Sequence, residues 1–180
     1  MRNLVVVLGL LIFLCSCSGS SSDWATHNSK AGGFSVQMPA PVANLKKNEV
    51  TPFGKQDRHF VRWKPSSFSI SRFKLFEVSY ITCPAYVSAD SMAIARVLDS
   101  AIELRKNDFS DVDMIESQAI ELNGYPGRAF FYDAPKGNTL VSVKICIAGN
   151  RLYDLVAIVK KDYSTNNEVA NFFNSFKLID

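Results

Sequence analysis

The sequence predicts an α+β domain in which an antiparallel β-sheet is flanked by helices. Two observations support this class: alternating apolar runs are separated by tight turn signals, and two other segments carry apolar residues at helical spacing. Apolar residues on both faces of the predicted sheet indicate a layered α/β/α sandwich. The 180 residues, 47% hydrophobic and 21% charged, fit one globular domain.

Alternation and turn signals place the strands of the N-terminal half. Trp24 opens the folded part or packs at its edge. The turn signal Pro52-Phe53-Gly54 separates two of these strands. Strands are expected over residues 34–39, 43–51, 56–64 and 68–82.

Two helices are expected, each with a capping signal. The first covers residues 89–106, with Ser88 as its N-cap. The second covers residues 166–177, where Thr165 and Glu168 form a capping box. Both carry an apolar stripe that would face the sheet.

The C-terminal half contains the strongest pattern, a four-stranded antiparallel meander. Asn123-Gly124 is the strongest short hairpin signal because both residues tolerate positive φ, and Gly149-Asn150-Arg151 marks a second hairpin. The strands are expected over residues 114–122, 125–133, 140–148 and 152–159. Residues 155–159 are all apolar, which indicates that both faces of that strand are covered.

Four motifs recur in the same order in a known group of domains. They are residues Gly33–Pro39, Leu122–Arg128, Gly149–Leu155 and Phe172–Leu178. In this order the chain resembles the PsbP/Mog1-like group of small α+β domains over most of residues 32–180. The resemblance implies a Mog1/PsbP-like α/β/α sandwich and a role in binding partners. It carries no catalytic motif, and a shared fold does not transfer a function.

The first residues predict export. Residues 4–14 form an unbroken apolar run behind Arg2, which is typical of a signal peptide and too short for a transmembrane helix of about 20 residues. Leu14-Cys15-Ser16-Cys17 resembles the lipobox of bacterial lipoproteins, which implies cleavage before Cys17 and its acylation. Secretion without a lipid is the alternative.

These signals divide the chain into three parts and suggest its location. Residues 1–16 are a signal peptide, 17–31 a lipidated Cys with a flexible tether, and 32–180 a single α+β domain. Ser18 after the modified Cys resembles the outer-membrane sorting pattern, which in a diderm host implies an outer-membrane anchor facing the periplasm.

Charge is uneven along the chain. Without Arg2, 19 basic residues face 17 acidic ones, which does not favour nucleic-acid binding. Basic residues dominate between positions 46 and 74 and form a candidate patch for anionic lipid headgroups or an acidic partner. The patch consists of Lys46, Lys47, Arg58, Arg62, Lys64, Arg72 and Lys74. The favoured alternative is an ordinary solvated strand face.

Cysteine and histidine give no catalytic pattern. A disulfide between Cys83 and Cys146 would stabilise an exported domain by roughly 4 kcal/mol, but buried free thiols are the favoured interpretation. His59 shares an apolar face with Val61 and Trp63, which favours a packed histidine over a catalytic one. We predict no catalytic residue, metal site or cofactor.

The sequence therefore predicts a non-enzymatic envelope lipoprotein that binds or assists another envelope component. A carrier of a small ligand or lipid, with a pocket between helix and sheet, is the alternative.

Overall fold

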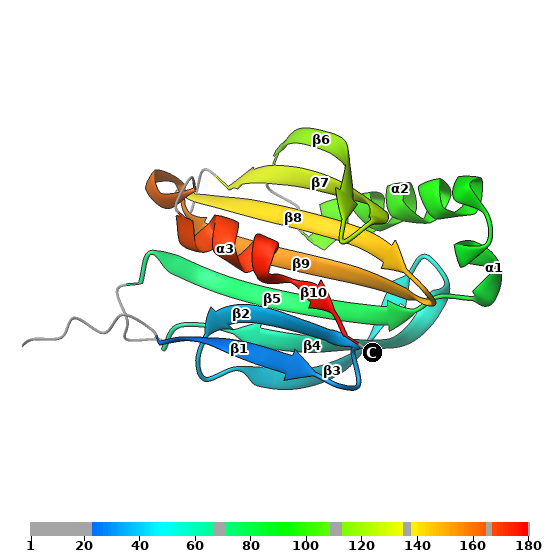
Figure 1. The fold of residues 1–180 in the computed structure, drawn as a ribbon. Coiled ribbons are helices and arrows are strands. Elements are labelled where there is room, and N and C mark those ends of the chain that lie inside the picture. Colours follow the sequence, from blue (N-terminus) through cyan, green and yellow to red (C-terminus); the bar gives the residue numbers. More distant parts are fainter. Residues whose placement is uncertain (1–22, 67–70, 109–112, 135–137, 165–166, 180) are drawn as a thin grey trace, which may run out of the picture.

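A seven-stranded antiparallel sheet organises the molecule in the computed structural model, which describes residues 23–66, 71–108, 113–134, 138–164 and 167–179 (Figure 1). The strand order is β3-β4-β5-β9-β8-β7-β6. The strands are β3 (Ala43–Thr51), β4 (Gly54–Trp63), β5 (Phe73–Thr82), β6 (Asp113–Leu122), β7 (Tyr125–Ala134), β8 (Thr139–Ala148) and β9 (Arg151–Lys160). The predicted antiparallel sheet and its C-terminal meander are confirmed.

A second, three-stranded sheet lies against the large one. It consists of β1 (Trp24–Ser29), β2 (Phe34–Pro39) and β10 (Lys177–Leu178), in the order β1-β2-β10. The central strand β2 pairs along one edge with β1 and along the other with β10. The two ends of the described chain therefore meet on one strand.

Each face of the large sheet has its own apolar core. The helices α1 (Ala85–Ser88) and α2 (Ser91–Asp108) cover one face, and the small sheet covers the other together with α3 (Asn167–Ser175) (Figure 1). A short 3-10 turn, η2 (Lys161–Tyr163), precedes α3. A layer made of helices alone is thus not confirmed on the second face, because the small sheet of β1, β2 and β10 shares that face with α3.

Side chains of the central strand β9 pack into both cores, as the apolar sequence of this strand predicted. Leu155 and Ala157 point into the core beneath the small sheet and α3, whereas Leu152 and Val156 point into the core beneath α2. The hairpin before β7 also matches its prediction, since Asn123 has a φ of 53°.

The start of the first long helix differs from its prediction. Ser88 ends α1, where its hydroxyl donates to the carbonyl of Ala85 at 3.0 Å. Asp90 instead caps α2, because its Oδ1 accepts from the backbone N–H of Met92 at 2.8 Å. A carboxylate at this position also faces the positive end of the helix dipole, which a hydroxyl does not exploit. Of the second capping box, Thr165 lies outside the described residues.

The folded part begins earlier than residue 32. The strand β1 lies inside the segment 17–31 that was predicted as a tether, and it pairs with β2 over six residues. Trp24 lies against Phe73 and Phe76, with ring centroids 6.5 and 5.2 Å apart. These aromatic contacts hold a polar strand that alternation alone did not reveal.

Candidate functional site

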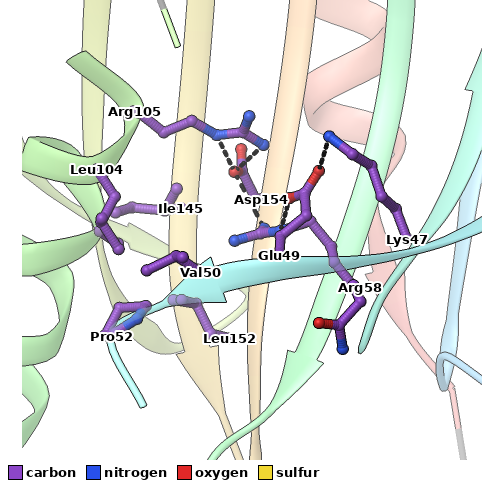
Figure 2. A pocket seen from close by; sticks show the side chains of 12 residues that line it. Lys47, Glu49, Val50, Pro52, Arg58, Leu104, Arg105, Ile145, Leu152 and Asp154 are labelled. Atoms are coloured by element: carbon purple, nitrogen blue, oxygen red, sulfur yellow. Dashed lines mark hydrogen bonds and ion pairs between the residues drawn. The ribbon is translucent and has the colours of Figure 1, made fainter. Parts of the chain in front are cut away.

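A cavity of about 440 Å³ opens between α2, the end of β3 and the large sheet (Figure 2). This volume lies within the range typical of small-ligand sites. Its lining consists of Lys47, Asn48, Glu49, Val50, Pro52, Arg58, Ala101, Leu104, Arg105, Ile145, Leu152 and Asp154. The lining divides into a charged side and an apolar side.

The charged side is a chain of alternating cations and carboxylates that begins on α2 and ends on β3. Arg105 donates from Nε to Oδ2 of Asp154 at 2.6 Å, and Nη1 of Arg58 lies 3.5 Å from the same oxygen. Nε of Arg58 lies 3.2 Å from Oε2 of Glu49. Nζ of Lys47 lies 2.9 Å from the other oxygen of Glu49. The chain joins four elements of the fold, α2, β9, β4 and β3, and becomes exposed only at Lys47.

Burial makes this network costly to break. The side chains of Asp154, Arg58 and Arg105 are 3%, 8% and 14% exposed. Charges this deep are tolerated only when each has a close counter-charge. Arg58 also donates from Nη1 to the hydroxyl of Ser79 at 3.1 Å, which adds a neutral acceptor.

Strand register explains why these residues meet. Ser79 of β5 lies opposite Phe60 of β4 on one side and opposite Asp154 of β9 on the other. Arg58 is two residues from Phe60 and therefore points to the same face of the sheet. On α2, Ala101 and Arg105 are four residues apart and share the helix face that looks onto this row.

A second ion pair, partly buried, lies next to this network. Arg62 of β4 donates from Nε to Oε2 of Glu77 on β5, directly across the strand pair. Burial raises the pKa of Glu77 above its usual value, and the nearby guanidinium of Arg62 opposes that rise only in part. The α2 side of the sheet thus contains an unusual amount of buried charge.

The apolar side of the cavity is formed by α2 and the strands around it. Figure 2 shows these side chains together, away from the carboxylates of Glu49 and Asp154. They are Val50, Pro52, Leu104, Ile145 and Leu152. Val50 lies at the cavity mouth, where its side chain is 60% exposed.

The seven residues of the predicted basic patch do not form one exposed surface. Arg58 is buried in the network, and Arg62 pairs with Glu77. Lys46 pairs with Asp57 at 2.7 Å, Lys47 with Glu49, and Arg72 with Glu168 at 2.6 Å. Lys64 and Lys74 are exposed, without an ion pair to another described residue. Most of the predicted positive charge is therefore balanced locally.

Cys83 and Cys146 are free thiols on opposite faces of the large sheet, each buried in a different core. The sheet between them leaves no room for the disulfide that the sequence left open. Burial raises the pKa of both thiols to about 12. They are therefore packed side chains, the interpretation that the sequence favoured.

The histidines occupy structural positions. The ring of His59 stacks on Tyr80, with centroids 5.0 Å apart and planes 11° from parallel. Nε2 of His27 lies 3.1 Å from the carbonyl oxygen of Met38, across the β1–β2 pair. No group of three or more His, Cys, Asp or Glu side chains in the described ranges could hold a metal ion. Cys17, the predicted lipidation site, lies outside the described residues.

Sequence reasoning missed the network around Asp154. The sequence did carry a signal, since Asp154 is a single acidic residue inside the apolar segment Leu152–Val159. A carboxylate at a buried strand position requires a cation from elsewhere. The sequence could not show that Arg58 and Arg105 supply it.

Comparison with known proteins identifies the fold. No protein-family model and no curated protein matches the sequence. The solution structure of cyanobacterial PsbP (CyanoP) from Synechocystis sp. PCC 6803 is similar over 92% of this chain and 98% of that chain, with a TM-score of 0.59 and 13% identity. The fold is therefore PsbP-like, as the sequence motifs indicated.

Two further structures share less with the chain. One is from Bacteroides thetaiotaomicron VPI-5482, with 14% identity over 86% of this chain and 48% of that chain, and a TM-score of 0.42. The other is a Pseudomonas aeruginosa protein of unknown function, with 8% identity over 82% and 90% of the two chains and a TM-score of 0.41. Among the described helices, none is long and apolar enough to cross a bilayer.

Proposed function

We propose, starting from the PsbP-like fold, that this chain is a non-enzymatic lipoprotein of the cell envelope that binds another envelope component. Cleavage before Cys17 and acylation of that residue would hold it at the membrane. Several acyl chains give a durable anchor because each buried CH₂ contributes about 0.8 kcal/mol. The lipobox-like sequence and the short tether before β1 support this proposal.

The observation that carries the proposal is the position of Lys64 and Lys74, the two patch residues that form no ion pair with another described residue. Trp24, the first residue of β1, contacts Phe73 at the start of β5. Figure 1 shows β1 beginning at the end of the molecule where β4 stops and β5 starts. Lys64 follows β4 directly, and Lys74 is the second residue of β5, so both lysines lie at the end of the molecule where β1 begins.

A lipid anchor would keep this basic end close to the bilayer. Near an anionic membrane surface each Lys or Arg contributes about 1 kcal/mol of attraction, screened within a Debye length. Lys64 and Lys74 would therefore orient the tethered domain with its basic end towards the headgroups. That orientation leaves the opposite end of the molecule free to meet a partner.

Vesicle binding tests the basic end. In the full chain, Lys64→Glu with Lys74→Glu should lower its binding to vesicles that contain phosphatidylglycerol, and added salt should reduce the difference. The matched control is Lys30→Glu with Lys55→Glu, which changes the net charge equally at two other exposed sites. Equal losses in both double variants would show that only net charge matters and would refute the proposed orientation.

Metabolic labelling tests the anchor. Cells given labelled palmitate should tag the native chain but not a Cys17→Ser variant, which should leave the membrane fraction. Full-length protein in the cytosol without label would contradict the anchor. Co-purification of the acylated protein from its own membrane fraction would then identify the bound component.

A second function, a carrier of a small ligand, is favoured by the cavity beneath α2. Its volume of about 440 Å³ and its mixed lining are typical of a ligand site. Native mass spectrometry of the protein purified from its own cells should then show a retained small molecule. A spectrum with only the mass of the acylated chain would count against the carrier function.

A further inference from the structure

We infer that the groove between α3 and β8 binds a small monocarboxylic acid, with its carboxylate at Lys144 and its apolar part against Phe131 and Phe173. This groove lies on the opposite face of the large sheet from the cavity beneath α2, and the inference goes beyond both proposed functions. Three features support it: a cation without a counter-charge, an apolar lining and a matching size.

Strand pairing and helix packing bring the lining of the groove together. Phe131 of β7 lies opposite Ser142 of β8, and Lys144 is two residues further along β8, so the three side chains point to the same face. Figure 1 shows α3 lying along β8 and β9 on this face. The helix contributes Ala170 and Phe173 to the lining. The groove is therefore built from elements that the fold holds in place.

Lys144 lacks a counter-charge. Among the described residues of the lining it is the one that carries a charge, and it forms no ion pair with a described carboxylate. Its Nζ lies 4.9 Å from the centre of the Phe173 ring, so the amine lies over α3 in a cation–π contact. Burial lowers the pKa of Lys144 below its usual value, as expected for a cation that has lost water.

The acidic residues on the same face do not balance Lys144. Asp133 of β7 already pairs with Lys161 at 2.6 Å. Glu116 of β6 lies opposite Phe131, which places it two strands away from Lys144. An ammonium group has three N–H donors, and a ring face is a weaker acceptor than a carboxylate oxygen. A carboxylate bound in the groove would supply both the acceptor and the missing negative charge.

The size and lining of the groove define the rest of the ligand. Its volume is about 180 Å³, and a cavity of about 150 Å³ with apolar walls is large enough to bind benzene. Drug-sized ligands occupy about 300–1,000 Å³, so the groove suits one ring or a short branched chain rather than a long acyl chain. The rings of Phe131 and Phe173 offer that group an apolar surface, and Ser142 and Ser164 add hydroxyl groups.

Equilibrium dialysis of two probes of the same shape tests the ligand class. The full chain, held in phosphatidylcholine nanodiscs, is dialysed against radiolabelled benzoate or benzamide, with empty nanodiscs as the blank. Benzoate should bind saturably and at least about tenfold more tightly than benzamide, because a charged hydrogen bond to Lys144 separates the two probes. Benzoate that binds no more tightly than benzamide would overturn the assignment of a carboxylate.

Removal of the ammonium group tests the role of Lys144. Lys144→Met keeps an unbranched apolar side chain and should lower the affinity for benzoate to that for benzamide, with benzamide binding unchanged. The matched control is Lys55→Met, which removes the same charge at an exposed site on β4 and should keep the preference for benzoate. Equal losses of benzoate binding in the two variants, or no loss in Lys144→Met, would refute the role of this lysine.

Filling the groove tests its location. Ala170→Phe places a ring in the groove from an exposed position on α3 and should abolish saturable binding of both probes. The matched control is Asn171→Phe, at the next exposed position of the same helix and outside this lining. If Ala170→Phe binds benzoate like the native chain, the groove is not the site. If benzoate does not bind the native chain saturably, the inference fails, whereas the envelope role and the cavity beneath α2 are unaffected.

Discussion

Arg105 of α2 donates to Asp154 of β9 at 2.6 Å, and this contact joins the long helix to the central strand of the sheet. Elsewhere α2 contacts the sheet through apolar side chains such as Leu98 and Ile102. The ion pair fixes the position of the helix on the sheet, because it determines which turn of α2 lies over β9. The same pair bounds the cavity, so stability and binding share these residues.

Removal of Asp154 should destabilise the domain strongly. Asp154→Ala removes the buried carboxylate that Arg58 and Arg105 share, and loss of one partner of a buried ion pair costs about 3–5 kcal/mol. Urea unfolding of native and variant proteins measures the difference. The control is Asp57→Ala, which breaks the exposed pair with Lys46 and should change stability little. Equal losses in the two variants would contradict the structural role of the network.

Glu77 should make stability fall as the pH rises from acid. Its pKa is raised above 4.5 in the folded state, mainly by burial, so the unfolded chain releases this proton first. Above pH 4.5 that release favours unfolding until the pH passes the folded-state pKa. Glu77→Gln lacks the titration. The stability of the native chain relative to Glu77→Gln should therefore decrease between about pH 4 and 7 in urea titrations.

A constant or increasing difference in that series would mean that pairing with Arg62 outweighs burial. Carboxylates with lowered pKa values, such as Asp57, give the opposite slope. They are present in both proteins, so their contribution cancels in the comparison.

The two buried thiols should resist alkylation in the folded protein. With pKa values of about 12, Cys83 and Cys146 are almost fully protonated at about pH 8, and the thiolate is the reactive form. Maleimide should label both only after urea is added, as peptide mass spectrometry can show. Rapid labelling of either residue without denaturant would mean that its core opens readily.

The N-cap of α2 is Asp90 in the structure, whereas the sequence predicted Ser88, and the stability of two variants can distinguish them. Asp90→Ala removes the acceptor for the N–H of Met92 and should cost about 1 kcal/mol of stability. Ser88→Ala removes only a hydroxyl that bonds within the short helix α1 and should have a smaller effect. Thermal unfolding of both variants measures the order. The reverse order would restore Ser88 as the cap.

Local patterns predicted the elements whose signals lie close together in the chain. The hairpin at Asn123 and Gly124 needs only two residues with positive φ, so its strands could be placed from the sequence. The strand β9 was recognised as covered on both faces because its apolar run has no alternation. By contrast, β1 is short and polar. Its Trp24 packs against aromatic rings that are close in space but far away in the sequence, such as Phe76.

The candidate site depends on contacts that no local pattern contains. Arg58 was assigned to a solvated face because it alternates with apolar neighbours on β4. In the structure α2 covers that face, and Arg58 meets Asp154 there. Only the packing of helix against sheet reveals that a charged residue on this face is buried. Five basic residues of the predicted patch also pair with carboxylates, which neighbouring residues in the chain do not indicate.

The first and last strands of the described chain share one partner. The strand β1 pairs with β2 from Phe34 to Pro39, β10 pairs with β2 at Phe34 and Ser35, and the N–H of Ile179 donates to the carbonyl of Gly33 at 2.9 Å. Fraying at one end therefore loosens the bonds that secure the other. Deuterium should enter the backbone amides of both terminal strands in a single opening event, so a protease that nicks one would release its counterpart.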